Sequence, residues 1–445
     1  MHHYGVCVLI CALPLAAAAA EVTFSSEVAP ILYSKCVGCH HQGDIAPMSL
    51  VSYKETRPWA RSIREAVRQK RMPPWHADPH YGEFSNDTRL SAPEIATLTA
   101  WVDQGAVEGD PAKLPAAPVF QEGWHAGKPD AVFAIPEPHK VTANAKDEYI
   151  YFRVPTSFTE DVWVRAVELR PGNRRVVHHA HVYLSRAKTP KKQNVKQNNF
   201  TIQDGAVQHI NPAMPVLDDG CASPDGGYWP GGKPGESTTM LGSYLPGKEP
   251  DVFPEGYARK IPAGAVLEFQ IHYNARKTDE VDRTSVGLFF SKEPPKQVLR
   301  RLDIQNFLFE IPPGAPNHKV TACYTLPKDV EMMAYTAHMH LRGKDMKFEA
   351  IRPNGERTTL LSVPRYDFNW QTVYKLKKPD LLEKGTVIYI TAHFDNSANN
   401  PINPDPSKAI RYGEPSYEEM MGGWFEYIDA PPGRPGETAS AGTVE

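Results

Sequence analysis

The stretch Val176-Val177-His178-His179-Ala180-His181-Val182-Tyr183 places three imidazoles inside an apolar run that predicts a buried strand. Successive side chains of a strand point to opposite faces, so His179 and His181 share one face and His178 points to the other unless the backbone bulges. Imidazoles at this density favour a metal site, and the alternative is a polar strand face with hydrogen-bonded histidines. The spacing therefore predicts a chelate and leaves its members open.

Similar histidines recur downstream in a weak internal repeat. His272 and His393 each follow a glycine at the same separation, and His338 with His340 repeats the spacing of His179 and His181. Two related β-sandwiches in tandem account for both pairs. Each half can hold one metal, because residues two apart on a strand face can grip a single ion. For His393 the alternative is a hydrogen-bonded strand histidine.

Residues 1–20 have an apolar run that ends in alanines before Glu21. This pattern predicts a secretory signal peptide cleaved near Ala20, and the run is too short for a comfortable membrane span. We therefore expect a periplasmic or secreted protein without a membrane span. The formal net charge of -3 gives no reason to expect nucleic acid or an anionic membrane as a partner.

The motif Cys36-Val37-Gly38-Cys39-His40 has the C-x-x-C-H pattern of covalent c-type haem attachment. In this pattern Cys36 and Cys39 bond the vinyl groups of the haem and His40 ligates its iron. A zinc half-site would need a second cysteine pair, and a thioredoxin-like redox pair would need a βαβ context. The motif therefore predicts one covalent haem c.

The residues around this motif have helical spacing. A capping box from Ser91 to Glu94 opens a helix that we expect to stop at Gly105. These features predict a small all-α cytochrome c domain. Its sixth iron ligand is expected to be Met72, with His76 and Met48 as alternatives.

The rest of the chain contains apolar or alternating runs separated by turns, in a sequence with 42 prolines and 31 glycines. Strands at this density without helices between them imply antiparallel sandwiches. Near the end, Met420 and Met421 precede an aromatic strand, and a thioether beside two imidazoles favours Cu(I). Such a methionine pair is more often part of a core.

The ordered motifs His178-His179, Gln270-Ile271-His272-Tyr273, His338-Met339-His340 and Glu419-Met420 resemble the copper-ligand motifs of the ascorbate-dependent type II copper monooxygenases. This is the family of peptidylglycine hydroxylating and dopamine β-hydroxylating enzymes. The resemblance covers about residues 125–430, and a bacterial branch with an N-terminal cytochrome c is similar in its architecture.

The resemblance implies two jelly-roll domains that each bind one copper ion and face one another across an open cleft. It implies that one site stores electrons and that the other activates oxygen. The implied ligands of the first copper are His178, His179 and His272, with His181 as a possible extra. The implied ligands of the second copper are His338, His340 and Met420, which together with Gln270 near the first copper are the expected catalytic residues.

The predicted organisation follows from these motifs. It consists of a signal peptide (1–20), a cytochrome c domain (21–108), a linker (109–124), two copper jelly-roll domains (125–295 and 296–430) and a disordered tail (431–445).

The chain also departs from the family pattern. In peptide-amidating members an arginine and an asparagine bind a peptide carboxylate, and Thr336 and Gly422 stand at those positions here. The numerous disulfides of the family are also absent, because Cys221 and Cys323 are the only cysteines outside the signal peptide and the haem motif. Whether these two pair is open from spacing alone.

The predicted function is an exported, haem- and copper-dependent monooxygenase. It would use molecular oxygen to hydroxylate a small organic substrate, with electrons that an ascorbate-like reductant or a redox protein delivers through the cytochrome c domain. One alternative is oxygen or peroxide chemistry without a hydroxylated product. Another is a copper-binding or redox-sensing electron-transfer protein without turnover. The sequence does not identify the substrate, because the side chains of the cleft come from loops.

Overall fold

The structure is a computed structural model. It describes residues 21–43, 46–120, 123–145, 148–185, 201–203, 206–208, 219–220, 239–245, 248–413 and 415–431. The chain divides into two compact units. The smaller unit contains the described residues of 1–42, 46–73 and 90–118, and the larger unit contains those of 43–45, 74–89 and 119–445.

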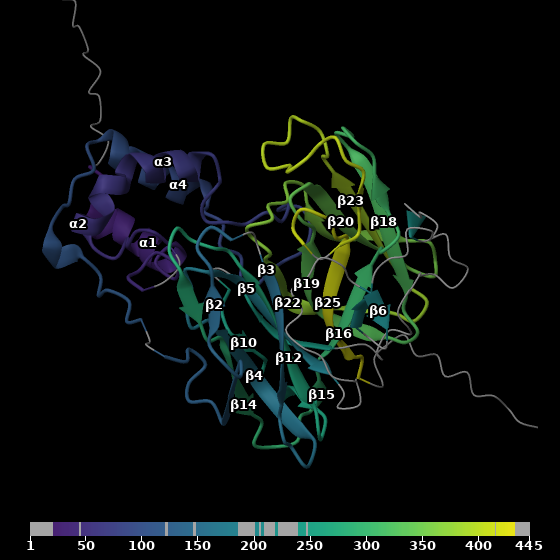
Figure 1. Cartoon of the computed structure of the whole chain (residues 1–445). Coiled ribbons are helices and arrows are strands. Elements are labelled where there is room, and N and C mark those ends of the chain that lie inside the picture. The colour runs from purple at the N-terminus through teal and green to yellow at the C-terminus, as the bar shows by residue number, and fades with distance from the viewer. Residues whose placement is uncertain are drawn as a thin grey trace, which may run out of the picture. The chain divides into compact units, whose positions relative to one another are not determined.

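The smaller unit is built from short helices (Figure 1). They are the π-helix η1 (Phe24–Val28), α1 (Ala29–Lys35), α2 (Tyr53–Thr56), the 3-10 helix η2 (Arg57–Trp59), α3 (Ala60–Arg68), α4 (Ala92–Asp103) and the 3-10 helix η3 (Pro111–Lys113). The predicted capping box is confirmed, because Ser91 and Glu94 exchange side chain to backbone hydrogen bonds at the start of α4. Trp101 of α4 is fully buried, and its ring lies 6.1 Å from that of Phe24. Phe24 of η1 and Trp101 of α4 thus belong to a small buried core of this unit.

In the larger unit, we call the two sheets that come first in the chain the first sheet pair, and a small two-stranded ribbon accompanies them. One sheet has the order β1 (Ala131–Ala134), β14 (Ser285–Phe290), β4 (Val162–Arg170), β11 (Tyr257–Ile261) and β15 (Gln297–Val298), and β10 (Asp251–Val252) also pairs with β4. The other has the order β3 (Glu148–Pro155), β12 (Val266–Tyr273), β5 (Val177–Ser185) and β9 (Thr239–Tyr244). The ribbon joins β13 (Glu280–Asp282) to β2 (His139–Val141).

The second sheet pair follows in the chain. One sheet has the order β16 (Arg300–Gln305), β25 (Gly422–Asp429), β19 (Val330–His338) and β22 (Val373–Leu382). The other has the order β21 (Arg357–Val363), β20 (Gly343–Ile351), β23 (Val387–Phe394), β18 (His318–Thr325) and β8 (Asp219–Gly220). Two short ribbons remain, β17 (Glu310–Ile311) with β24 (Ile410–Arg411), and β6 (Thr201–Gln203) with β7 (Ala206–Gln208).

Strand alternation places the histidines on the face that points away from the core, both in the sheet with β5 and β12 and in the sheet with β19 and β25. In β12 the side chains of Phe269 and Ile271 enter the core of the first sheet pair, so Gln270 and His272 point the other way. In β25, Phe425 enters the core of the second sheet pair, which leaves Trp424 on the opposite face. The polar and aromatic faces of both sheet pairs are therefore available to build a site.

The segment 74–89 connects α3 to α4 in sequence, yet it belongs to the larger unit. Trp75 and Phe84 are buried in the core of the second sheet pair, with their rings 5.1 and 5.4 Å from that of Tyr374. Phe84 also forms a β-bridge with Leu376 of β22, and the side chain of Asn86 bonds the backbone of the same strand. The segment thus extends the edge of a β-sheet.

The predicted fold class, a small all-α cytochrome c domain followed by two antiparallel jelly-roll sandwich domains, is wrong. The described chain is mostly β, and its α-helices have only 4 to 12 residues. No all-α cytochrome c domain is evident in the described residues, because residues 74–89 leave the helical region for the β core. Nor is the pairing wholly antiparallel, since β11 pairs in parallel with β15, and β18 with β8. The domain boundaries given above stay predictions.

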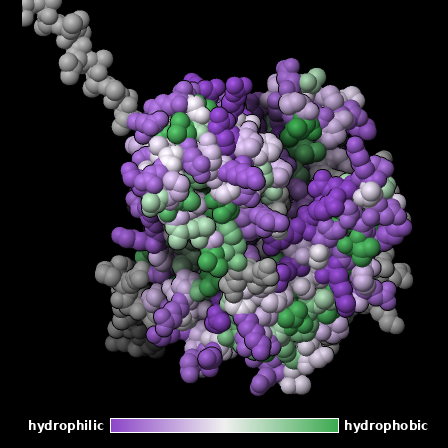
Figure 2. All heavy atoms as spheres, turned by 90° about the vertical axis from the view of Figure 1, so that its left-hand side faces the viewer, coloured by the Kyte–Doolittle hydropathy of each residue, from purple (hydrophilic) through white to green (hydrophobic). Residues whose placement is uncertain are grey.

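On the molecular face in Figure 2, hydrophilic side chains predominate, and hydrophobic ones form small separate groups. Small scattered apolar groups are usual on protein surfaces. Among the described residues, none of the helices has the length and apolarity that crossing a membrane requires.

Candidate functional site

The first histidine cluster contains His178, His179 and His272, whose candidate ligand atoms all lie within 4.8 Å of one another. A β-bulge brings the adjacent pair together. His272 pairs with His179 and Tyr273 pairs with Val177, so His178 is the extra residue on β5. The bulge turns His178 toward its neighbours, which strict alternation would not allow.

Distances within this cluster fit a metal ion. His272 Nδ1 lies 3.2 Å from His178 Nδ1 and 3.2 Å from His179 Nε2. Two nitrogen ligands at about 2.0 Å from an ion with near-tetrahedral angles are separated by roughly this distance. Burial, followed by the neighbouring histidines, lowers the pKa of His179 well below its ordinary value. Neutral imidazole is the form that binds a metal.

Two residues beside the first cluster complete its surroundings. The ring of Tyr149 stacks on that of His272 at 4.2 Å. His181, the possible extra ligand, is buried with its ring 5.0 Å from that of His179, but it is not a member of the three-residue group. Gln270 pairs with His181 across the strands and donates a hydrogen bond from Nε2 to the hydroxyl of Tyr151 at 2.5 Å.

The second candidate site lies where β19 ends, at His338 and His340. Their rings are 5.3 Å apart and perpendicular, and both residues are buried. His338 Nδ1 lies 2.8 Å from Oε1 of Gln371, and His340 Nδ1 lies 3.3 Å from the carbonyl oxygen of Glu418. Partners of this kind fix a ligand imidazole through one nitrogen and leave Nε2 for a metal.

Burial also keeps these two imidazoles neutral. It lowers the pKa of His338 to about 4, although the Gln371 hydrogen bond acts in the opposite direction. The pKa of His340 falls well below its ordinary value for the same main reason. Both residues are therefore ready metal ligands at neutral pH.

Glu419 joins the histidine strand to the methionine loop. Its Oε2 accepts hydrogen bonds from the backbone N–H of His340 at 2.7 Å and of Met420 at 3.2 Å, and its Oε1 accepts one from the N–H of Arg342 at 2.6 Å. Met421 is fully buried in the hydrophobic core, whereas Met420 is only partly buried. Of the two thioethers, that of Met420 is thus the one outside the core.

Two aromatic side chains lie between the clusters. The ring of Phe368 is 5.7 Å from that of His178 and 5.6 Å from that of His340. The ring of Trp424 stacks on that of His338 at 4.6 Å and meets that of His181 edge-on at 6.1 Å. Sequence patterns missed these contacts and the role of Gln371, because only strand pairing reveals them.

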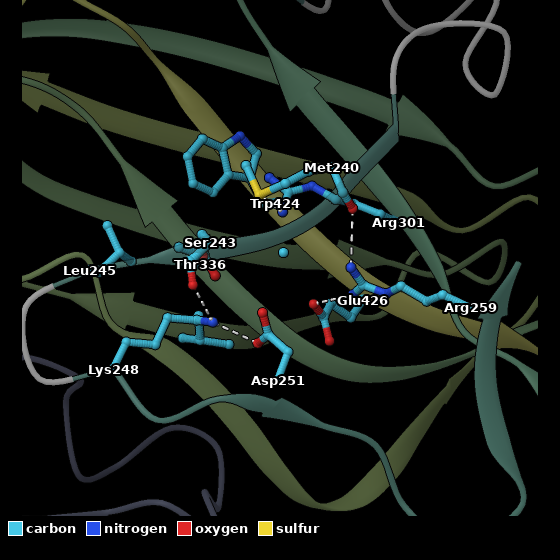
Figure 3. A pocket seen from close by; sticks show the side chains of 12 residues that line it. Met240, Ser243, Leu245, Lys248, Asp251, Arg259, Arg301, Thr336, Trp424 and Glu426 are labelled. Carbon is cyan, nitrogen blue, oxygen red and sulfur yellow. Dashed lines mark hydrogen bonds and ion pairs between the residues drawn. The ribbon is translucent and has the colours of Figure 1, made fainter. Parts of the chain in front are cut away.

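A cavity of about 20 Å³ lies beside Trp424 (Figure 3). Charged side chains from both sheet pairs line it, and they form ion pairs between Lys248 and Asp251 and between Arg259 and Glu426. Such a volume holds about one water molecule. The cavity is therefore too small for an organic substrate. Thr336, which stands at a position of the missing carboxylate clamp, is also in its wall.

The haem motif lies in the smaller unit. Cys36 and Cys39 are both partly buried, and burial raises the pKa of the Cys36 thiol to about 12. His40 Nδ1 lies 3.3 Å from the carbonyl oxygen of Met48, so Nε2 is the nitrogen left for iron. The covalent haem itself stays a prediction from the motif.

The candidate sixth ligands fall in different units. Met72 belongs to the smaller unit with the haem motif, whereas His76 belongs to the larger unit. The pKa of His76 is lowered by burial and by Arg365, while Asp367 opposes this change. The choice of Met72 as the iron ligand stays a prediction.

Other sequence-predicted residues have structural partners. His393 Nδ1 lies 2.7 Å from Oδ1 of Asp345, so it is a hydrogen-bonded strand histidine. Cys323 is disulfide-bonded, and Cys221 lies outside the described residues.

Comparison with known families addresses the second sheet pair. Residues 309–427 match the family model described as copper type II ascorbate-dependent monooxygenase, C-terminal domain. The match supports a relation of residues 309–427 to the copper-dependent, ascorbate-dependent monooxygenases. That family implies a copper cofactor, molecular oxygen and an ascorbate-like reductant. His338, His340 and Met420 all lie within the matched residues.

No curated protein matches the chain. Among solved structures, the major capsid protein P2 of bacteriophage PM2 is 10% identical, with 67% of this chain and 97% of that chain covered and a TM-score of 0.25. PNGF-II is 9% identical, with 67% and 65% covered and the same TM-score. Similarities this weak carry no argument about fold or function.

Proposed function

We propose that this protein is an exported monooxygenase that hydroxylates a C–H bond of a small organic substrate, with two copper ions and one haem c. The observation that carries the proposal is the presence of two clustered histidine sets in one unit, the second of them within the monooxygenase family match. The predicted signal peptide supports a periplasmic or secreted location.

The chain supplies two sets of copper ligands in this proposal. His178, His179 and His272 hold one ion, and His338, His340 and Met420 hold the other. Copper, when bound, supplies one-electron storage and the activation of oxygen. Burial lowers the pKa values of His179, His338 and His340, and Gln371 orients His338. Glu419 fixes the distance between the backbones of His340 and Met420.

Each hydroxylation consumes one O2, two electrons and two protons, and it yields the hydroxylated product and water. We assign the entry of these electrons to a haem bound by Cys36 and Cys39, with His40 and Met72 as iron ligands. The donor is an ascorbate-like reductant or a redox protein. The C-x-x-C-H motif and the contact of His40 Nδ1 with the carbonyl oxygen of Met48 support this assignment.

The test is oxygen consumption by the copper- and haem-loaded protein with ascorbate and a panel of small organic compounds. We expect one hydroxylated product for each O2 consumed, with ¹⁸O from labelled O2 in the product. The matched control is His338→Ala, which should bind haem normally and form no product.

The competing function is a copper-binding electron-transfer protein without turnover. It would show reversible reduction of copper by the haem and no labelled product with any compound. Oxygen uptake that yields only hydrogen peroxide would likewise contradict the monooxygenase proposal.

A further inference from the structure

Trp424 lies between Arg301 and His338 on one face of a sheet. β25 runs between β16 and β19, and Trp424 pairs with Asp303 on one side and with Thr336 on the other. Arg301 and His338 are therefore diagonal neighbours of Trp424 from the two flanking strands. Figure 3 shows Arg301 and Trp424 together beside the cavity.

Both neighbours contact the indole ring. The His338 ring stacks on it with a centroid distance of 4.6 Å and an interplanar angle of 18°. The guanidinium carbon of Arg301 lies 4.6 Å from the centroid of the same ring. Tryptophan is the best aromatic partner for a cation, and the geometry is well within the usual 6 Å limit.

The stack is anchored at both ends. Arg301 Nε donates a hydrogen bond to Oδ1 of Asp303 at 2.5 Å, and its Nη1 lies 3.0 Å from Sδ of Met240 in the first sheet pair. At the other end, Gln371 contacts His338 Nδ1. The imidazole is therefore restrained at one ring face and at one nitrogen, which defines where Nε2 points.

We infer that Arg301 and Trp424 are positioning residues that hold the His338 imidazole in its metal-binding orientation. The inference rests on the proposed function in one respect, that the metal at His338 and His340 is copper. Residues that orient a ligand in this way typically change metal affinity by about 10- to 100-fold when they are replaced. A stack that only fills space would affect folding and leave the bound metal unchanged.

The experiment compares three variants with the wild type as metal-free full-length proteins. Trp424→Leu removes the ring, Trp424→Phe keeps an aromatic face, and Arg301→Met removes the cation. The matched control is Trp163→Leu, because Trp163 also lies under a cation, at 5.8 Å from Lys260 Nζ, but in the first sheet pair on β4. Each protein is titrated with Cu(II) against a competing chelator, and the EPR spectrum is recorded at one and two equivalents.

We expect two copper ions in the wild type. Trp424→Leu should weaken one of them by about 10-fold and change its hyperfine splitting, while Arg301→Met gives a smaller change in the same signal. Trp424→Phe should restore most of the affinity, and Trp163→Leu should match the wild type.

Wild-type affinity and spectra in both Trp424→Leu and Arg301→Met would overturn the positioning role and leave the proposed function intact. If Trp424→Leu does not fold, Arg301→Met decides by the same criterion. A wild-type protein that binds no copper at these histidines would overturn both the inference and the proposed function.

Discussion

At the scale of single residues, Met420 and Met421 differ in their surroundings. Met421 is fully buried in a hydrophobic core. The backbone N–H groups of Met420 and His340 both donate hydrogen bonds to the side chain of Glu419. We therefore expect Met420→Ala to perturb the second copper site and spare the first, as measured by EPR. Met421→Ala should instead lower the free energy of unfolding by about 2 to 5 kcal/mol with both copper signals unchanged. A larger copper effect from Met421→Ala would reverse this assignment.

Four buried histidines make the metal-free protein sensitive to acid. Burial lowers the pKa values of His179, His181, His338 and His340 in the folded state. Below about pH 6.5 the unfolded chain takes up protons that the folded chain does not, so stability falls as the pH decreases. Each histidine contributes up to about 1.4 kcal/mol per pH unit in this window.

Urea unfolding of the metal-free protein between pH 7.5 and 5 measures this slope. The slope reports how many more protons the unfolded chain binds than the folded chain. His181→Gln should reduce that number by about one at the acidic end of the range and leave the slope unchanged above pH 7. A free energy of unfolding that is constant from pH 7 to 5 would contradict the prediction.

Sequence patterns could identify the candidate ligands but not the neighbouring residues that hold them in place. His178, His179 and His272 lie together in the structure, whereas the alternation of a strand favoured His179 with His181. The bulge that decides between them depends on pairing with β12, almost a hundred residues away. Trp424 reaches His338 only because β25 pairs with β19. Such contacts follow from register, which short motifs do not encode.

At the scale of elements, the segment 74–89 shows how local patterns misled the fold prediction. The predicted cytochrome c domain (21–108) includes this segment, which lies between helices in the sequence. In the structure Trp75 and Phe84 lie in a β core, and Asn86 bonds the edge strand β22. Burial of two large aromatic side chains outweighs the proximity of helices in the sequence.

This docking predicts a specific stability effect. Phe84→Ala should lower the free energy of unfolding of the larger unit by about 3 to 5 kcal/mol, because it leaves a cavity beside Trp75 and Tyr374. The matched control is Tyr81→Ala in the same segment, since Tyr81 is 40% exposed and should change stability little. Urea unfolding followed by circular dichroism at β-sheet wavelengths measures both. Equal effects from the two variants would mean that the segment is not part of the core.

At the scale of the whole molecule, covalent connections join the two units at several points. Among other points, the chain passes between them at Pro73–Pro74, at Arg89–Leu90 and at Pro118–Val119. The proposed haem site on Cys36 and Cys39 is therefore tethered to the copper-binding unit by more than one linkage. Tethering turns an encounter between electron carrier and acceptor into an intramolecular event with a high effective concentration.

We therefore predict that reduced haem delivers electrons to Cu(II) within one molecule. Stopped-flow mixing of the loaded protein with a limiting reductant should show rapid haem reduction, followed by haem reoxidation as copper is reduced. The rate of reoxidation should be independent of protein concentration. A mixture of two defective chains is the control, one with Cys36→Ala and Cys39→Ala and the other with His179→Ala and His338→Ala. In this mixture the haem and the intact copper ligands lie on different molecules, so reoxidation should become slower and second-order. If the intact protein already reoxidises with second-order kinetics, or if its haem stays reduced beside Cu(II), the haem does not serve the copper sites of its own chain.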